Sequence, residues 1–243
     1  MEKVLSQLVD KLRKAYGDRL VSVVLYGSAA AGDYHSRFSD LNTLCVLSQV
    51  TPSELRAAEE VFRWWRGHGN PAPLLVTEQE LAASTDCFPI EFHDIRQNHR
   101  LLHGKDVVMA LEIGRAFYRA QVEHELRAKL LRLRQKAAGL LSDHDLLRRL
   151  MADSISTFCV LFRHALVLHG VDAPAAKRQV IQLAGSHFGV DPLPFEQLLG
   201  VREERIRPRE IEPIPLFESL LAGISKVIDA VDKLGEGAHD SAG

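Results

Sequence analysis

The sequence predicts an α/β domain with a small mixed sheet and helices on one side of it, followed by an all-α helical bundle. Three observations predict this fold class. Residues 1–110 alternate helical and strand-like hydrophobic patterns, residues 111–235 are almost entirely helical in periodicity, and short connections join the later helices. We expect two domains over these ranges and a disordered tail over residues 236–243, where the chain has little to bury.

The composition is that of a soluble globular protein. Of the 243 residues, 46% are hydrophobic and 26% are charged, and 30 Lys and Arg against 32 Asp and Glu give a net charge of -2. The hydrophobic and charged fractions exclude a disordered chain, and the near-zero net charge argues against nucleic acid as a partner. No apolar run is long enough to suggest a membrane span, and the first residues lack a signal-peptide pattern, so we expect a cytoplasmic protein. Three cysteines without a Cys-x-x-Cys pair predict reduced, buried thiols.

The first 110 residues predict alternating elements. Apolar residues at helical spacing indicate a helix over 4–12, and the β-branched run 20–26 indicates a strand that ends at Gly27 and Ser28. A second strand is expected over 41–47, and a helix opens at Pro52 and runs to about residue 65.

Shorter elements complete this half. We expect a strand over 74–76, a helical turn over 78–84 and a strand over 88–95. In the last of these, Glu91 stands between two apolar residues and would point to the opposite face of the sheet from both.

The second half predicts helices throughout. Apolar residues step by three or four along two long helices, over about 122–140 and 147–170. Shorter helices follow over 174–188, 192–205 and 214–234. Such a series with short connections is typical of a helical bundle.

A group of residues between the first two predicted strands suits phosphate and metal binding. Gly27 allows a tight turn, and the main-chain N–H groups there, with the Ser28 hydroxyl, suit a phosphate. Asp40 and Asn42 stand at the start of the next strand, two residues apart, so their side chains leave the same face. Oxygen ligands beside a phosphate cradle suit a Mg²⁺ ion that also contacts a triphosphate.

These residues resemble the motif of the nucleotidyltransferase superfamily, which includes DNA polymerase β and the kanamycin and streptomycin nucleotidyltransferases. Its pattern is an apolar strand, Gly-Ser, a loop of about ten residues and Asp-x-Asp or Asp-x-Glu entering a second strand. Gly27, Ser28, Asp40 and the position of Asn42 match it, and a helical second domain is similar as well. The resemblance implies a Mg²⁺-dependent enzyme that transfers a nucleoside monophosphate from an NTP, with ATP the expected donor, to a hydroxyl acceptor.

The resemblance also implies roles for single residues. Gly27 and Ser28 would bind the nucleotide phosphates, and Asp40 would bind Mg²⁺ with Asn42 as a weaker ligand. The family uses a third carboxylate, for which Glu91 is the first candidate, as metal ligand or catalytic base, and Asp94 the second. Arg37, in the loop, would contact a phosphate or be a surface arginine. The kanamycin enzyme builds its site between two subunits, so a homodimer is one expected arrangement.

Asn42 departs from the family pattern. An asparagine offers one amide oxygen and no charge where the active enzymes carry an acid. The alternative function is therefore a catalytically impaired nucleotide-binding regulatory module with a protein partner. The identity of the acceptor and the preferred base stay open.

A second, weaker resemblance lies in the helical half. Arg163 and His169, with five residues between them, resemble the Arg-x(4–6)-His motif of HEPN ribonucleases. This implies a minor alternative, an RNA-cleaving helical domain with His169 as acid or base. A histidine at the end of a helix, favoured by the helix dipole, is the structural alternative.

Overall fold

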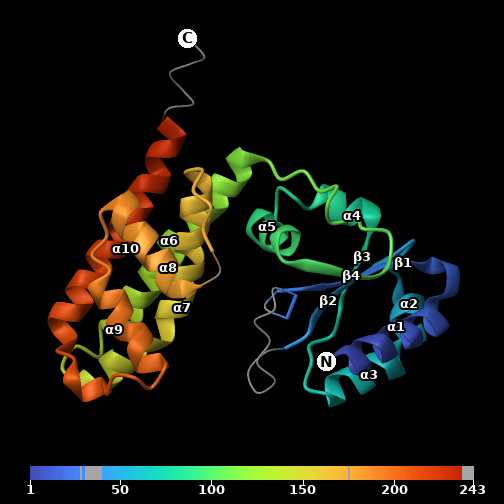
Figure 1. Ribbon diagram of the computed structural model, residues 1–243, viewed down its shortest axis with the longest axis horizontal. Helices are drawn as coiled ribbons and strands as arrows, with labels where there is room; N and C mark the ends of the chain where they lie inside the picture. Colours follow the sequence, from blue (N-terminus) through green and yellow to red (C-terminus); the bar gives the residue numbers. More distant parts are fainter. Residues whose placement is uncertain (28, 31–39, 175, 237–243) are drawn as a thin grey trace, which may run out of the picture. The chain divides into compact units, whose positions relative to one another are not determined.

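The computed structural model describes residues 1–27, 29–30, 40–174 and 176–236. The chain divides into two compact units, Met1–Gly114 and Arg115–Gly243. The β-sheet and its helices belong to the first unit, and the second unit is built from helices (Figure 1). The tail predicted over residues 236–243 lies, apart from its first residue, outside the described part of the chain.

The N-terminal unit contains a four-stranded mixed sheet in the order β3-β2-β1-β4. Strand β1 is antiparallel to both β2 and β4, whereas β2 is parallel to β3. The predicted small mixed sheet is therefore confirmed. In chain order the elements are α1 (Glu2–Tyr16), the 3-10 helix η1 (Gly17–Arg19), β1 (Leu20–Tyr26), β2 (Asn42–Leu47), α2 (Pro52–Ala57), α3 (Glu59–Gly67), β3 (Leu74–Thr77), α4 (Glu78–Ala83), α5 (Pro89–Gln97) and β4 (His99–Gly104).

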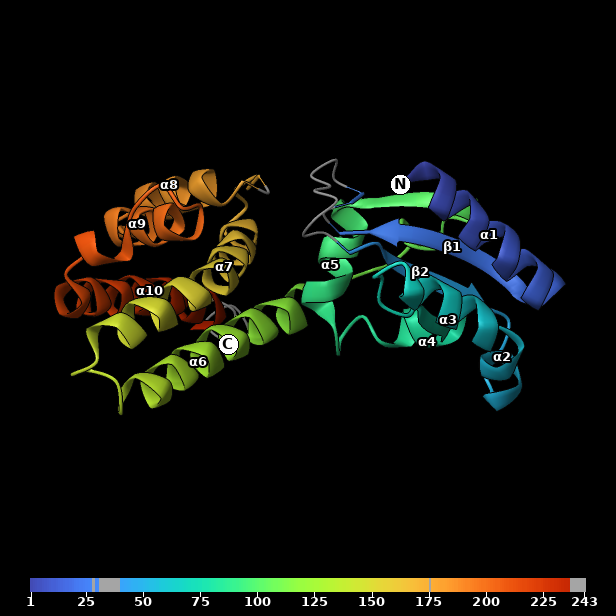
Figure 2. The ribbon, with the colours of Figure 1, turned by 90° about the horizontal axis from the view of Figure 1, so that it is seen from below.

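Both faces of the sheet are covered, and the prediction of helices on one side is wrong. On one face, Val23 and Cys45 pack with the apolar side of α1 and with Trp65 of α3. On the other face, Val24 and Leu44 pack with α4, α5 and the segment 107–111. Figure 2 shows α1 and α4 along the sheet. The two clusters follow the two-residue alternation of the strands, because successive side chains leave opposite faces.

The strand predicted over residues 88–95 is instead the helix α5. Pro89 occupies the first turn, where its missing N–H has no helical partner to lose. Pro89, Phe92 and Ile95 are buried at a spacing of three, which is a helical and not a strand periodicity. The fourth strand is β4, whose two apolar residues, Leu101 and Leu102, are adjacent and give no strand-like alternation.

The helix predicted from Pro52 to about residue 65 is divided into α2 and α3, with a break at Ala58. Thr51 caps α2 in a reciprocal arrangement with Glu54, whose carboxylate accepts hydrogen bonds from the N–H and the hydroxyl of Thr51. The Glu54 side chain is fully buried and forms an ion pair of 2.6 Å with Arg19. This pair joins the start of α2 to the start of β1.

The C-terminal unit is the predicted helical bundle. Helix α7 lies at its centre and contacts α6, α8, α9 and α10, with Phe158 and Phe162 among its buried residues. Phe162 packs against Phe195 of α9 at a ring distance of 5.2 Å. The elements are α6 (Arg115–Ala137), α7 (His144–Leu168), α8 (Lys177–Phe188), α9 (Leu193–Arg202), the 3-10 helix η2 (Pro208–Glu210) and α10 (Pro213–Glu236).

Helix α7 is the one helix in the described part of the chain that is long and apolar enough to cross a membrane. Of the apolar window that meets this criterion, 61% is buried inside the protein. That burial is typical of a central helix in a bundle, whose apolar character serves packing against its neighbours.

Candidate functional site

Gly27 forms a tight turn directly after β1. Its φ angle is +79°, in the left-handed region that glycine adopts without steric penalty. Its N–H donates to the carbonyl of Asn98 at 3.2 Å, and its carbonyl accepts from the N–H of Ala30 at 3.0 Å. The main chain of Gly27 is therefore held on both sides at the end of the strand.

Asn42 lies beside this turn. It is the first residue of β2 and pairs with Tyr26, the last residue of β1. Its Nδ2 atom is 3.5 Å from the position that a Cβ atom on Gly27 would occupy. Asp40 precedes the strand by two residues and is exposed. The structure thus brings Gly27 and Asn42 together and leaves the Asp40 carboxylate in solvent.

Asn70 fixes the start of β2, a role that the sequence analysis missed. Its side-chain Oδ1 accepts a hydrogen bond of 3.1 Å from the N–H of Leu41, the residue between Asp40 and Asn42. Asn70 is 9% exposed and stands in a Gly-Asn-Pro sequence. Its local sequence is that of an ordinary turn, so only the long-range bond identifies it.

Two predicted phosphate ligands, Ser28 and Arg37, lie outside the described residues, and their roles stay predictions. Both candidates for the third acid lie on α5. Glu91 is exposed in the first turn, contrary to its expected place in a strand, and Asp94 is half-buried one turn later.

The end of α5 reaches the Gly27 turn. Asn98, which follows the last residue of α5, accepts the Gly27 N–H bond, and its own N–H donates to the carbonyl of Asp94 at 2.9 Å. With a rise of about 1.5 Å per residue, Asp94 lies about 6 Å along the helix from Asn98, and Glu91 about 10 Å. Sequence alone did not place either acid relative to Gly27, because it predicted a strand here.

His99 and Asp106 form a polar pair at the start of β4. His99 Nε2 lies 3.1 Å from Asp106 Oδ2, and Nδ1 lies 3.1 Å from the carbonyl of Arg96. Burial opposes ionisation of Asp106, but its hydrogen bonds with His99 and the N–H groups of Met109 and Val108 lower its pKa below the usual value. Since His99 pairs with Tyr26, this hydrogen-bonded pair supports the strand beside the Gly27 turn.

Asp40 and Asn42 supply part of the oxygen ligands that a magnesium ion needs. The Asp40 carboxylate is exposed and forms no ion pair with another described residue, and the Asn42 amide supplies a second oxygen. Hard oxygen ligands of this kind suit Mg²⁺, which is commonly held by one or two carboxylates together with substrate phosphates and water. One carboxylate and one amide would therefore hold Mg²⁺ mainly through the nucleotide.

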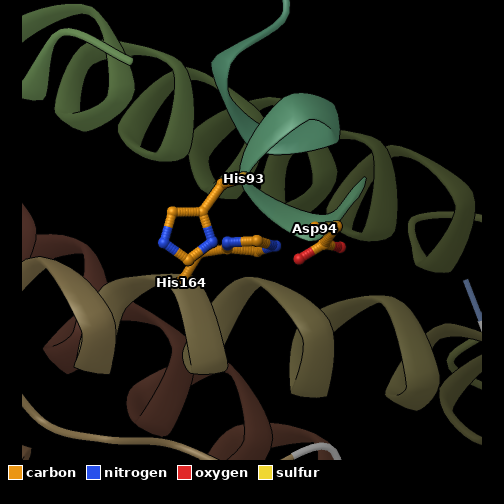
Figure 3. A group of neighbouring side chains, drawn as sticks. All are labelled: His93, Asp94 and His164. Atoms are coloured by element: carbon orange, nitrogen blue, oxygen red, sulfur yellow. The ribbon is translucent and has the colours of Figure 1, made fainter. Parts of the chain in front are cut away.

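His93 and Asp94 are neighbours on α5, and His164 stands on α7 (Figure 3). The first two belong to the N-terminal unit and the third to the helical unit. Within the helical unit, the hydroxyl of Tyr118 lies 2.7 Å from His164 Nδ1, so this histidine joins α6 to α7.

The weaker sequence resemblance, to HEPN ribonucleases, rests on Arg163 and His169 of the helical unit. Six residues along an α-helix turn the side chain by about 600°, which places Arg163 and His169 about 120° apart around the axis. His169 ends α7, where its Nε2 lies 3.2 Å from the carbonyl of Ala230 and its ring packs on Phe188. These contacts give His169 a structural role in joining α7 to α8 and α10.

No protein-family model matches the chain, and no curated protein matches it. Among solved structures, it is similar to the spectinomycin adenyltransferase AAD(9) from Enterococcus faecialis, solved with ATP and spectinomycin. The TM-score is 0.57 at 15% identity, over 96% of this chain and 99% of that one. A toxin-antitoxin structure with AMP-PNP aligns over 57% of this chain and 96% of its own, with 16% identity and a TM-score of 0.31. The mixed sheet, the glycine turn at the end of β1 and the likeness to AAD(9) over nearly the full length agree: this chain has a nucleotidyltransferase-type fold.

Proposed function

We propose that this protein is a Mg²⁺-dependent nucleotidyltransferase that moves a nucleoside monophosphate from an NTP to a hydroxyl group of an acceptor, with release of pyrophosphate. The observation that carries the proposal is the turn at Gly27, with Asn42 against it and Asp40 two residues away in solvent. The likeness to AAD(9), which was solved with ATP, supports ATP as the donor.

Each proposed site residue would have its own role in binding the nucleotide, the metal ion or the proton. The main chain at Gly27 and the hydroxyl of Ser28 would bind the β- and γ-phosphates, with Arg37 as a further phosphate ligand. Asp40 would bind Mg²⁺, with the amide oxygen of Asn42 as auxiliary ligand, and the ion would neutralise charge on the phosphates. An acid on α5 would accept the proton of the acceptor hydroxyl.

Either Glu91 or Asp94 would be that acid, and a pair of isosteric variants separates them. Glu91→Gln and Asp94→Asn keep the shape of each side chain and remove its ability to accept a proton. Loss of a general base lowers turnover by about 10²–10⁴-fold. We expect one variant to show this loss and the other to retain most activity.

The experiment that tests the proposal is thermal unfolding with each NTP, with and without Mg²⁺. A ligand at about 100 times its Kd stabilises the folded state by about 2.7 kcal/mol. We expect a Mg²⁺-dependent shift with ATP that Asp40→Ala abolishes and Asp18→Ala retains, since Asp18 is exposed beside the opposite end of β1. Absence of a shift with every NTP would contradict the proposal.

A second candidate function follows from Asn42. A site with one fewer carboxylate than the family pattern fits a nucleotide-binding regulatory module that does not transfer. Release of labelled pyrophosphate from γ-labelled ATP, with and without a panel of hydroxyl acceptors, separates the two functions. Asn42→Asp should raise a weak activity if the protein is a transferase, and should leave none if it is a binding module.

A further inference from the structure

The helical unit contains a cavity of about 900 Å³ whose lining includes none of the residues assigned to the proposed transfer reaction. Its walls come from the first half of α7, the end of α9 and the segment through η2. Five arginines line it, against three acidic residues: Arg148, Arg149, Arg202, Arg207 and Arg209.

Two of these arginines are held in place by main-chain carbonyls. Arg148 Nε donates to the carbonyl of Ile211 at 2.8 Å, and Arg202 Nη1 donates to the carbonyl of Ala152 at 3.2 Å. The Arg148 side chain is only 13% exposed, with Asp145 at 2.9 Å. Both guanidinium groups bridge two segments of the wall, so the positive charge of the cavity is fixed before any ligand arrives.

The other three arginines lack strong internal partners. Arg149 lies 3.9 Å from Asp153, and both side chains are at least 70% exposed, so this pair contributes little. Arg207 and Arg209 form no ion pair or side-chain hydrogen bond with any residue that the structure describes, and both line the cavity. With five arginines against three acidic residues, the lining carries an excess of positive charge, which favours an anionic ligand.

From this geometry we infer that the cavity binds a polyphosphate group, an anion with several adjacent phosphoryl groups. Planar guanidinium groups bind phosphate oxygens through two parallel hydrogen bonds, and one phosphoryl group can bridge two arginines. A cavity of this volume is within the range of small-molecule sites. None of its lining residues is aromatic, so it offers no surface on which a base would stack, and the phosphate chain carries the recognition.

Calorimetric titration of the full chain with inorganic tripolyphosphate, in EDTA and at fixed ionic strength, tests this inference. We expect one site, with ATP binding no more than a few-fold differently from tripolyphosphate. The double variant Arg207→Ala/Arg209→Ala should raise the Kd at least about tenfold, since each charge-assisted pair is among the stronger hydrogen bonds. Both side chains are exposed, and an unchanged Tm would show that the variant folds.

Two matched variants make the result specific. Arg205 is an exposed arginine of the same segment, but it pairs with Glu203 and does not line the cavity. The Kd of Arg205→Ala should therefore equal that of the wild type. Asp40→Ala should also leave it unchanged, which separates this site from the proposed nucleotide site. Three outcomes would overturn the inference: no binding, equal weakening in Arg205→Ala, or tighter binding of a poly-glutamate peptide with the same arginine dependence.

Discussion

The main-chain N–H of Gly27 donates a hydrogen bond of 3.2 Å to the carbonyl of Asn98. Asn98 stands between α5 and β4, so this bond ties the turn after β1 to the end of the helix that carries both candidate acids. The adjacent pair, Tyr26 and His99, continues the ladder between β1 and β4. The turn, the sheet and α5 therefore hold one another in place.

Gly27 and Gly104 form a matched pair for stability, because both have a φ of +79°. A Cβ atom on Gly27 would lie 3.5 Å from Asn42 Nδ2, an ordinary contact, so Gly27→Ala should lower the free energy of unfolding by about 1–2 kcal/mol from the backbone alone. A Cβ atom on Gly104 would lie 2.0 Å from the carbonyl oxygen of Val21. Gly104→Ala must part β1 from β4 and should lower it by more than about 4 kcal/mol. Equal losses in urea unfolding would contradict this.

Asn70→Ala should uncouple the start of β2 from its support. The variant leaves the N–H of Leu41 without its 3.1 Å partner in a buried position, which should destabilise the fold by about 1–3 kcal/mol. Asn70→Asp keeps an oxygen at the accepting position and should retain most of the stability. Urea unfolding measures the difference, and the same two variants should show weaker and near-normal nucleotide-dependent stabilisation, respectively. Equal behaviour of the two variants would show that the bond to Leu41 is unimportant.

Glu54 should make the stability depend on acid pH. Hydrogen bonds from the Thr51 hydroxyl and the Gln49 amide lower the pKa of Glu54 to about 2. A carboxylate whose pKa is lower in the folded state stabilises the protein above its unfolded pKa of about 4.3, and the contribution is lost as the pH falls toward 2. Glu54→Gln should therefore destabilise the protein at pH 7, and the difference from wild type should shrink between pH 5 and pH 2. A difference that stays constant over this range would exclude the carboxylate charge as its cause.

The three cysteines should react unequally with a thiol reagent. Cys45 and Cys159 are buried, and burial raises the pKa of each to about 12, so both should be inert in the folded protein. Cys87 is exposed, contrary to the expectation that all three would be buried. A hydrogen bond with Asp86 raises its pKa, so its reaction should be slow at pH 7 and faster above pH 9. We expect one reactive thiol per native chain and three in denaturant, with Cys87→Ser as the control that removes the native reaction.

The sequence correctly predicted the elements with a strong periodic pattern. Repeated apolar residues predict strand β1 and the long helices α6 and α7. The prediction of a strand over residues 88–95 is wrong because, over so short a length, the apolar residues fit both the helical and the strand periodicity. Strand β4 was missed because its apolar residues, Leu101 and Leu102, are adjacent and flanked by polar ones, so this edge strand shows no two-residue alternation.

Some residues of the candidate site could be predicted from the sequence, and others could not. Gly27, Asp40 and Asn42 were found because their chemistry and spacing stand within one short stretch of sequence. Asn70 and Asn98 were missed because each acts through a single hydrogen bond to a residue at least 29 positions away. Nothing in the local sequence distinguishes such an asparagine from one in an ordinary turn.

The sequence by itself determined the order of the two units and the glycine turn after the first strand, because hydrophobic periodicity and turn chemistry are local properties. The mixed character of the sheet was implied by the resemblance to the nucleotidyltransferase superfamily. The tertiary structure alone decided which face of the sheet each helix covers, that both acids belong to a helix, and which asparagines support the turn. It also gathered five arginines from α7, α9 and the segment through η2 around one cavity. These outcomes depend on contacts between distant residues, whose energies come from burial and from hydrogen bonds that form only when the chain is folded.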